Sequence, residues 1–316
     1  MTRRRTRRKK PIPALLALAL ALLSLALGEY KGLLPTGTGQ GEEPIVQTGS
    51  EASPGQEPSA LPAADGAMTV HFIDVRQGDS LLAESDGHFL LVDAGENDQG
   101  DTVIAYLREA GVTSLDYVIG THPHSDHIGG LDDVIRAFDV KAVILPPVAH
   151  TTKTFEDVLD AVQEKNLTLT QPKPGDSYAL GDAAFTILAP QADYGDDLNN
   201  WSVGIRLACA EGALVACADA EAQAEEDIAA SGLPLSADVL KVGHHGSSTS
   251  TSNAFLQAVS PAWAVISCGE GNSYGHPHEE TLKKLEDAGV SVLRTDLLGD
   301  ITAQWGEDGI AWTYEK

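Results

Sequence analysis

The sequence predicts an α/β fold in which two mixed β-sheets pack together and helices cover the outside. Short runs of apolar and β-branched residues, typical of strands, alternate with amphipathic stretches of helical period. In each half of the chain, short β-like runs come first and strand–helix alternation follows. The 316 residues are enough to bury the core of one large domain or of two small ones.

Order is expected to begin near Met68, and the first half of the fold should alternate strands with helices. Asp101 precedes an amphipathic stretch and is predicted to cap its helix by accepting a hydrogen bond from a free backbone N–H group. The expected strands are residues 70–75, 80–84, 89–93, 117–119 and 142–145, and the expected helices are 102–110, 131–138 and 155–165.

The second half repeats this pattern, and a turn at Glu211-Gly212 should join two of its strands. Cys209 and Cys217 flank that turn, so a cross-strand disulfide is one interpretation. The favoured interpretation treats both, and Cys268, as small apolar strand residues. The expected strands are residues 185–188, 203–209, 214–218, 239–242, 264–267, 292–294, 301–305 and 310–314, and the expected helices are 222–230, 253–259 and 279–288.

The N-terminal segment is predicted to direct export rather than to join the fold. Seven cations at positions 3–10 precede an apolar run at 12–27, as in a signal peptide or a short membrane anchor. The run is shorter than the roughly 20 residues that a comfortable span needs, so cleavage after Gly28 and retention both stay open. The expected organisation of this secreted or extracytoplasmic membrane-anchored protein is signal or anchor at 1–28, flexible acidic linker at 29–66 and folded domain at 67–316.

The net charge restricts the partners. The chain carries −25, and beyond its first ten residues 14 basic residues stand against 46 acidic ones. This field repels nucleic acid at long range, and no stripe of Lys or Arg with interleaved aromatics is present to bind a strand. A nucleic-acid substrate is therefore expected to be short and to need bound metal that reverses the charge locally. No protein partner is evident, and an uncleaved N-terminal segment would add a membrane.

Four potential metal ligands lie within six residues of one predicted loop, between a strand and a helix. They are His122, His124, Asp126 and His127. Neutral imidazoles together with a carboxylate suit borderline divalent ions such as Zn²⁺ or Mn²⁺. The first two side chains can point to one side and the last two to the other, which would serve two adjacent ions. Gly129-Gly130 is expected to let the backbone turn tightly into the helix.

The His-x-His-x-Asp-His pattern of this loop resembles the hallmark of the metallo-β-lactamase superfamily. The neighbouring sequence is similar to the C-terminal hydrolase domain of the ComEC competence proteins and their free-standing relatives. The resemblance covers about residues 69–316 and implies the αββα sandwich of that superfamily. The motifs that carry it are residues 72–80, 91–95, 120–130, 214–219, 240–248 and 274–277.

The resemblance implies two divalent ions, with Zn²⁺ favoured and Mn²⁺ as the alternative. His122 and His124 would hold the first ion, and Asp219 would bridge both. Asp219 also ends an apolar strand, where a buried carboxylate is costly unless it is metal-bound or paired; the alternative is a helix cap before residues 221–230. The implied ligands of the second ion are Asp126, His127 and one of His244 and His245, of which His245 is favoured.

Two positions depart from the family pattern. Arg76 stands where the family usually has glycine, so the turn is altered or presents a cation to the substrate. Asn199 lies where many members place a third histidine on the first metal, and it would bind weakly through oxygen or leave the position to water. The first ion should therefore be held less tightly than the second. His150 is expected to be an ordinary surface residue.

The remaining candidates are assigned to the reaction and to the substrate. Asp126 would orient the attacking hydroxide, and His244 would donate a hydrogen bond to the substrate. His276 resembles a residue at the mouth of the family's active site and would protonate a leaving group, whereas His278 is expected to start a helix. The hydroxyls of the preceding loop suit a phosphate, or else form a plain polar loop; they belong to Ser247, Ser248 and Thr249.

These features predict metal-dependent hydrolysis of a phosphodiester by a nuclease or phosphodiesterase. An alternative is hydrolysis of another small extracellular ester, phosphocholine or lactam substrate, because the fold supports many chemistries. A third is a non-catalytic binding module with a degenerate site. The nearly complete set of ligands argues against this third interpretation.

Overall fold

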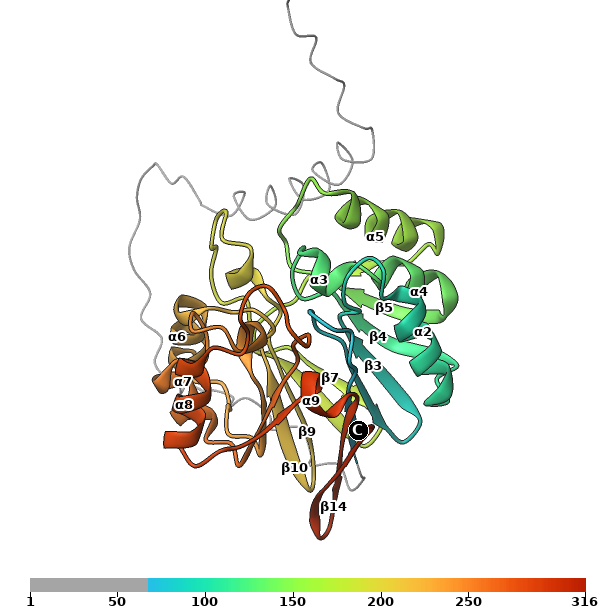
Figure 1. Ribbon diagram of the computed structural model, residues 1–316. Helices are drawn as coiled ribbons and strands as arrows, with labels where there is room; N and C mark the ends of the chain where they lie inside the picture. The colour runs from blue at the N-terminus through green and yellow to red at the C-terminus, as the bar shows by residue number, and fades with distance from the viewer. Residues whose placement is uncertain (1–67) are drawn as a thin grey trace, which may run out of the picture. The chain divides into compact units, whose positions relative to one another are not determined.

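Two mixed β-sheets face each other in the computed structural model, which describes residues 68–316 (Figure 1). The first sheet has the strand order β15-β14-β1-β2-β3-β4-β5-β6, and the second has the order β13-β12-β11-β10-β9-β8-β7. The expected signal peptide or anchor and the linker lie outside the described residues. Within the described part, no helix has the length and the apolar character that crossing a membrane requires.

The first sheet is built mainly from the N-terminal half of the described chain and is completed by the C-terminal hairpin. Its strands are β1 (Thr69–Phe72), β2 (Leu81–Ser85), β3 (His88–Val92), β4 (Ser114–Ile119), β5 (Asp139–Ile144), β6 (Leu169–Thr170), β14 (Ile301–Gly306) and β15 (Gly309–Tyr314). The second sheet contains β7 (Ser177–Leu180), β8 (Ala183–Ile187), β9 (Ile205–Cys209), β10 (Gly212–Ala216), β11 (Val239–Lys241), β12 (Trp263–Ile266) and β13 (Ser291–Arg294).

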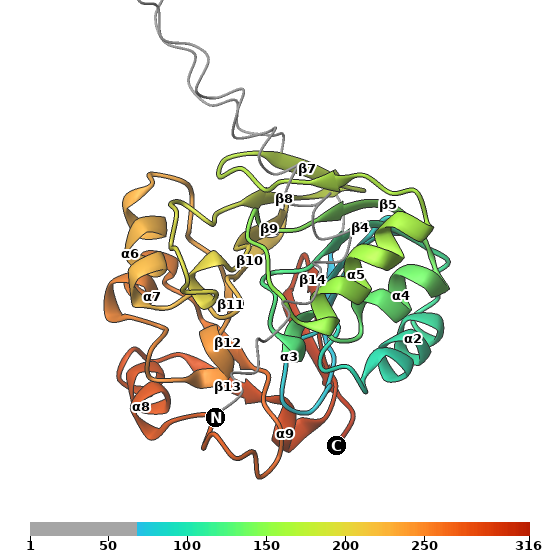
Figure 2. The ribbon, with the colours of Figure 1, turned by 90° about the horizontal axis from the view of Figure 1, so that it is seen from above.

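Helices form the two outer layers of the sandwich (Figure 2). Those that follow the strands of the first sheet are α2 (Gly100–Glu109), α3 (Ser125–Ile128), α4 (Leu131–Ala137) and α5 (Lys153–Glu164). Those that follow the second sheet are α6 (Ala222–Ala230), α7 (Asn253–Val259), α8 (Glu279–Asp287) and the short α9 (Thr295–Leu298). The predicted αββα sandwich is thereby confirmed.

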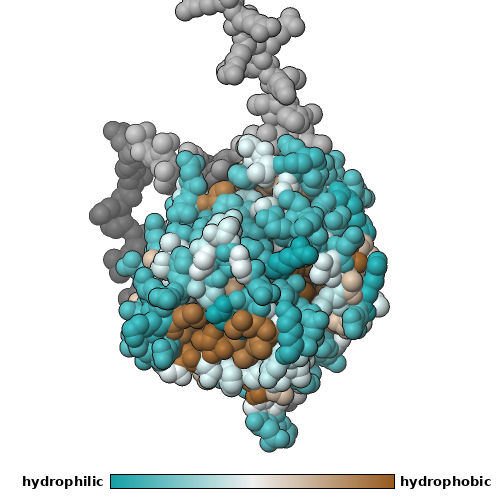
Figure 3. Space-filling model, in the orientation of Figure 1, coloured by the Kyte–Doolittle hydropathy of each residue, from teal (hydrophilic) through white to brown (hydrophobic). Residues whose placement is uncertain are grey.

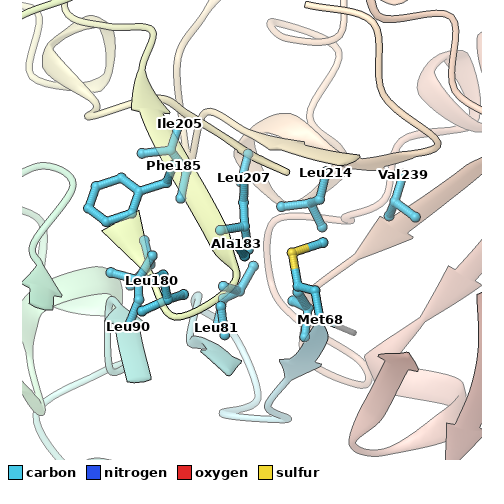
Figure 4. Packing of buried hydrophobic residues seen from close by; sticks show 14 of the residues in the cluster. Met68, Leu81, Leu90, Leu180, Ala183, Phe185, Ile205, Leu207, Leu214 and Val239 are labelled. Carbon is cyan, nitrogen blue, oxygen red and sulfur yellow. The ribbon is translucent and has the colours of Figure 1, made fainter. Parts of the chain in front are cut away.

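Three apolar clusters account for this layering. One lies between the sheets and joins residues of both, among them Leu90, Phe185 and Leu214 (Figure 4). A second fills the space beneath α2, α4 and α5, and a third fills the space beneath α6, α7 and α8. The surface is mostly hydrophilic on the face drawn in Figure 3, with its broadest apolar area below and to the left of the centre. Each helix is thus fixed by its apolar stripe, as in other layered α/β domains.

Parallel strands place the loops that carry the metal-ligand candidates at one edge. β3, β4 and β5 run parallel in the first sheet, as do β10, β11, β12 and β13 in the second. The loops after β4, β10 and β11 hold the residues from His122, Asp219 and His244 onward. Because parallel strands end at the same edge of a sheet, these loops meet above the two sheets.

One local expectation was wrong, two short strands were missed, and one of the two interpretations of the cysteines is excluded. Helix α2 begins at Gly100 with Gln99 at the N-cap position, so Asp101 lies in the first turn, where its charge still favours the positive end of the helix dipole. Strands β6 and β7 were missed because they are short and only partly buried. The cysteines are free: the cross-strand partner of Cys209 is Gly212, so Cys217 lies far along the ladder and the disulfide is excluded.

Candidate metal centre

Side chains from three loops converge where α3 meets the turn after β11. His127 is fully buried, Asp219 and His245 are almost fully buried, and Asp126 is one-quarter exposed. One ligand atom from each of these four residues lies within 4.8 Å of every other. The closest pairs are His127 Nε2 with Asp219 Oδ1 at 3.2 Å and His245 Nε2 with Asp126 Oδ2 at 3.3 Å. The geometry therefore joins the residues expected at the second ion and favours His245 as their histidine.

The second nitrogen of each of these histidines is already held by the protein. His127 Nδ1 lies 2.8 Å from Asp93 Oδ2, and Asp93 is itself fixed by the backbone N–H and hydroxyl of Thr121. His245 Nδ1 lies 3.1 Å from the carbonyl oxygen of Ser267 and 3.2 Å from Asp79 Oδ1. Such partners fix the tautomer and aim the free nitrogen, as outer partners do around metal ions.

The free atoms of this cluster fit a divalent cation. His127 Nε2, His245 Nε2 and Asp219 Oδ1 are buried and have no hydrogen-bond partner, which is unusual for polar atoms in a folded protein. Two imidazole nitrogens and carboxylate oxygens are the donors that Zn²⁺ and related ions take. The cluster therefore passes the test of donor chemistry for a metal site.

The electrostatics of the cluster favour positive charge. Burial alone would lower the pKa of His127, but the carboxylates of Asp219 and Asp126 outweigh it and raise the pKa well above its usual value. The same balance, with Asp219 and Asp79, raises the pKa of His245 to about 10. Burial would raise the pKa of Asp126, yet His127 and His245 lower it to about 2. A bound cation would satisfy the same carboxylates and displace the imidazole protons.

The first site has fewer donors. His122 Nε2 lies 3.0 Å from His124 Nδ1 and 3.9 Å from Asp219 Oδ2, so the two histidines and the bridging candidate face one region. His122 Nδ1 is within 3.3 Å of the Ser202 hydroxyl, which leaves Nε2 for a ligand. Asn199 lines the adjoining pocket, its Nδ2 donates to Glu221 Oε1, and its buried Oδ1 has no partner. A weak oxygen ligand at this position stays a prediction.

We expect the two sites to differ in affinity for Zn²⁺. The second site offers two imidazoles and two carboxylates, whereas the first offers two imidazoles and the shared carboxylate of Asp219, with no third imidazole. Titration of chelator-stripped protein with Zn²⁺ should give two steps whose Kd values differ at least about tenfold. Asn199→His supplies the missing imidazole and should reduce the difference by tightening the weaker step. Two equal steps in the unmodified protein, followed by calorimetry, would contradict this expectation.

His244 and His245 both adopt left-handed backbone conformations, with φ of 49° and 53°. Such conformations cost L-residues roughly 1–2 kcal/mol each, so the surrounding structure must hold them. Both side chains approach Asp219, because His245 Nε2 lies 3.6 Å from Asp219 Oδ1. His244 Nε2 lies 3.6 Å from Asp219 Oδ2, while its Nδ1 contacts the Thr249 hydroxyl at 3.1 Å. His244 thus lies at the edge of the metal cluster, and its contact with Thr249 fixes the orientation of its ring.

A pocket of about 330 Å³ opens beside the cluster. Its lining residues are Gln77, Glu96, His124, Ser125, Asp126, Asn199, Asp219, His244, His245, Tyr274 and His276. Burial, followed by the neighbouring His245 and His244, lowers the pKa of His276 to about 4. The ring is therefore neutral at pH 7 and can offer a hydrogen bond, whereas donation of a full proton requires more acidic conditions.

Ser247, Ser248 and Thr249 are not among the residues that line the pocket. The Ser247 and Thr249 hydroxyls contact each other at 3.1 Å, and the Ser248 hydroxyl contacts His278 Nδ1. These contacts fit a plain polar loop better than a phosphate-binding loop. Thr249 contacts His244 Nδ1 and so can affect the site by orienting that histidine. His278 stands at the N-cap position of α8, as expected.

Comparison with known proteins agrees with this geometry. The profile of the metallo-β-lactamase superfamily matches residues 73–270. The chain belongs to this superfamily. It is 32% identical over 76% of its length to ComE operon protein 3 of Bacillus subtilis, and 30% identical over 95% to competence protein ComA of Neisseria gonorrhoeae. The chain spans only 33% and 40% of these two relatives.

A solved structure shows the same fold. The metallo-β-lactamase fold protein YhfI of Bacillus subtilis aligns with a TM-score of 0.50 at 15% identity, and the alignment covers 73% of this chain and 96% of YhfI. Together with the buried donors described above, superfamily membership makes the chain a metal-dependent hydrolase with a site for divalent ions.

The alternative that Asp219 is a helix cap is excluded, because Glu221 occupies the N-cap position of α6.

The structure adds three observations to the sequence predictions about this metallo-β-lactamase site. Gly129 has an ordinary helical φ of −59°, so it is required for close approach rather than for a special turn: a Cβ atom would lie 2.3 Å from the backbone nitrogen of Asn97. His150 is partly exposed, and its ring lies 6.5 Å from that of His124, so this surface histidine adjoins the first site. Buried Lys241 and Asp79 were given no role, although Lys241 ends an apolar strand, which is a signal in itself.

Proposed function

We propose that this metal-dependent hydrolase cleaves phosphodiester bonds, outside the membrane, as a phosphodiesterase or a nuclease for short substrates. The observation that carries the proposal is the cluster of Asp126, His127, Asp219 and His245 beside an open polar pocket, with His122 and His124 next to it. Zn²⁺ is the proposed native ion and Mn²⁺ the alternative. When bound, a pair of such ions supplies Lewis acidity and lowers the pKa of water toward about 7.

The protein's own groups would then position the reactants. Asp126 is a carboxylate at neutral pH, because its pKa is lowered to about 2, and it projects into the pocket, where it can accept a hydrogen bond from the attacking water and orient it. Asp219 places one oxygen toward His127 and the other toward His122, so it would hold both sites in register.

Two histidines of the pocket face the remaining part of the substrate. His244 is fixed at Nδ1 by Thr249, which leaves Nε2 to donate a hydrogen bond to a non-bridging oxygen of the substrate. His276 lies 5.7 Å from His244, ring centre to ring centre. As a neutral imidazole, it would stabilise a departing oxygen through a hydrogen bond.

The substrate class rests on two arguments. One relative is named a competence protein and another recombination protein 2, which makes a DNA-derived diester the first class to test. The net charge of −25 argues against binding a long polyanion and favours small or short diesters. The N-terminal basic and apolar segment of the sequence supports the proposed extracytoplasmic location.

The test is a side-by-side assay of the purified protein on bis(p-nitrophenyl) phosphate, a short single-stranded oligonucleotide and a chromogenic lactam. We expect Zn²⁺- or Mn²⁺-dependent cleavage of the diesters that chelator abolishes and that Asp126→Ala reduces at least about a hundredfold. His88→Ala, a change of an exposed histidine on β3, is the matched control and should retain activity.

Other outcomes lead to the other candidates. Cleavage of the lactam alone would replace the proposal with hydrolysis of another small ester, phosphocholine or lactam substrate. Metal binding without turnover on any substrate, including a phosphocholine ester, would instead favour a binding module.

A further inference from the structure

Arg76 occupies a backbone conformation that suits glycine. Its φ is 63°, in the left-handed region, where the Cβ atom of an ordinary residue is crowded. The backbone N–H of Arg76 donates to Asp74 Oδ1 at 3.0 Å, a bond that glycine would make equally well. The conformation therefore gives no reason for arginine, and strain of this kind concentrates where a side chain has a function.

The arginine side chain does not contribute packing or a strong ion pair in return. The side chain is 78% exposed, and its guanidinium lies 3.8 Å from Asp98, which is 73% exposed. Ion pairs of this exposure contribute little to stability. The guanidinium is consequently held loosely and is available to another anion.

Arg76 lies where three loops that line the pocket meet. The next residue, Gln77, lines the pocket and accepts a hydrogen bond from the backbone N–H of Gly269 at 3.2 Å. Gly269 lies in the loop between β12 and α8, which also carries Tyr274 and His276, both of which line the pocket. On the other side, Asp98 follows Glu96, a further lining residue. Arg76 is not itself a lining residue, but it lies beside three loops that carry lining residues, which places it next to the pocket.

The pocket itself needs such a cation. Its lining residues include the carboxylates of Glu96, Asp126 and Asp219 but no Lys or Arg. Metal ions would offset the charge at the reacting phosphate, yet a second phosphate outside the metal cluster would meet only acidic or neutral groups. A guanidinium binds phosphate oxygens in a two-pronged manner and keeps its charge at any physiological pH.

We propose that Arg76 is a specificity-determining residue that binds a second, non-reacting phosphate of the substrate at the rim of the pocket. The inference rests on the proposed phosphodiesterase function and narrows it to substrates that carry more than one phosphate, such as 5′-phosphorylated oligonucleotides. Arg76 exchanges its weak contact with Asp98 for this phosphate when the substrate binds.

The experiment compares the unmodified protein with Arg76→Gly and Arg76→Lys. The probes are the dinucleotide pTpT, which carries a terminal phosphate, and TpT, which lacks it. Calorimetric titration of the Zn²⁺-loaded proteins measures affinity, and product formation measures kcat/KM. For Arg76→Gly, the preference for pTpT over TpT should fall about tenfold, and for Arg76→Lys by less, because the charge remains. The melting temperature of Arg76→Gly should rise by about 2–4 °C as the strain is removed.

Asp86→Gly is the matched control, because Asp86 has a φ of 49° and lies in the β2–β3 turn, beside Gly181 of the β7–β8 turn and outside the pocket lining. Its gain in stability should be smaller, because Asp tolerates the left-handed conformation better than Arg, and the preference for pTpT should remain. An equal preference in the unmodified protein and Arg76→Gly, or no binding of pTpT at all, overturns the inference. Binding that depends on Arg76 without hydrolysis of either dinucleotide would overturn the proposed function and leave the anion site standing.

Discussion

Replacing Asp219 with alanine is expected to remove tight metal binding and hydrolysis together. Its Oδ1 lies 3.2 Å from His127 Nε2 and its Oδ2 lies 3.9 Å from His122 Nε2, so one carboxylate serves both groups of ligands. Loss of an outer partner of a metal ligand typically costs about 10–100-fold in affinity. Loss of a shared direct ligand should exceed that, which puts the expected fall in Zn²⁺ affinity above about 100-fold.

The measurement is Zn²⁺ content after dialysis together with kcat/KM on the diester. Asp219→Asn separates charge from shape, since the amide fills the same space but provides one neutral oxygen, and we expect it to lose the ions nearly as completely. Asp308→Ala, in the exposed turn between β14 and β15, controls for loss of a carboxylate elsewhere. Near-ultraviolet circular dichroism checks the fold. Full metal content and activity in Asp219→Ala would show that the bridging assignment is wrong.

The sequence predicted those parts of the site whose residues are close together in the chain or end a conspicuous strand. His122, His124, Asp126 and His127 lie on one loop, so their chemistry is visible without knowledge of the fold. Asp219 was recognisable because a carboxylate at the end of an apolar strand needs a partner. Most strands of the two sheets were also predictable, because a buried strand appears in the sequence as a run of apolar residues.

The rest depends on contacts that only the folded chain creates. Asp79 and Lys241 are 162 residues apart, and nothing local in the sequence pairs them. The left-handed backbone at His244 and His245 opposes the local preference of ordinary residues and is imposed by the surrounding structure. Strand β6 has only Leu169 and Thr170, neither of them buried, so tertiary pairing with β5 decides its conformation rather than its own pattern.

Replacing Lys241 with methionine is expected to lower the free energy of unfolding by about 3–5 kcal/mol, because a buried carboxylate loses its counter-charge. Lys241 Nζ lies 2.8 Å from Asp79 Oδ1, and the two side chains are 4% and 8% exposed. Asp79 also contacts His245 Nδ1, and its backbone N–H donates to the carbonyl oxygen of Asp126. The variant should therefore bind Zn²⁺ more weakly as well, by about the 10–100-fold typical of outer partners.

Urea unfolding in the presence of chelator measures the free energy of unfolding without any contribution from bound metal. Lys283→Met is the matched control: it removes a lysine that pairs with Asp287 at the surface, where both side chains are more than 60% exposed. Such a pair contributes at most about 1 kcal/mol. In a double-mutant cycle, Asp79→Asn combined with Lys241→Met should cost less than the sum of the single changes by at least about 1 kcal/mol.

The pH dependence of the free energy of unfolding shows whether Lys241→Met destabilises the protein through lost charge balance or through lost packing. Burial alone would raise the pKa of Asp79, but Lys241 and then His245 outweigh it and hold the pKa below its usual value of 3.8. Stabilisation by such a carboxylate is present above the unfolded pKa and is lost as the pH falls toward the folded pKa. Without Lys241 the folded pKa of Asp79 rises, so the variant's deficit should be largest near pH 7 and should shrink toward pH 4 as Asp79 takes up a proton. A deficit below about 1 kcal/mol, or one independent of pH, would mean that Lys241 fills space and does not balance charge.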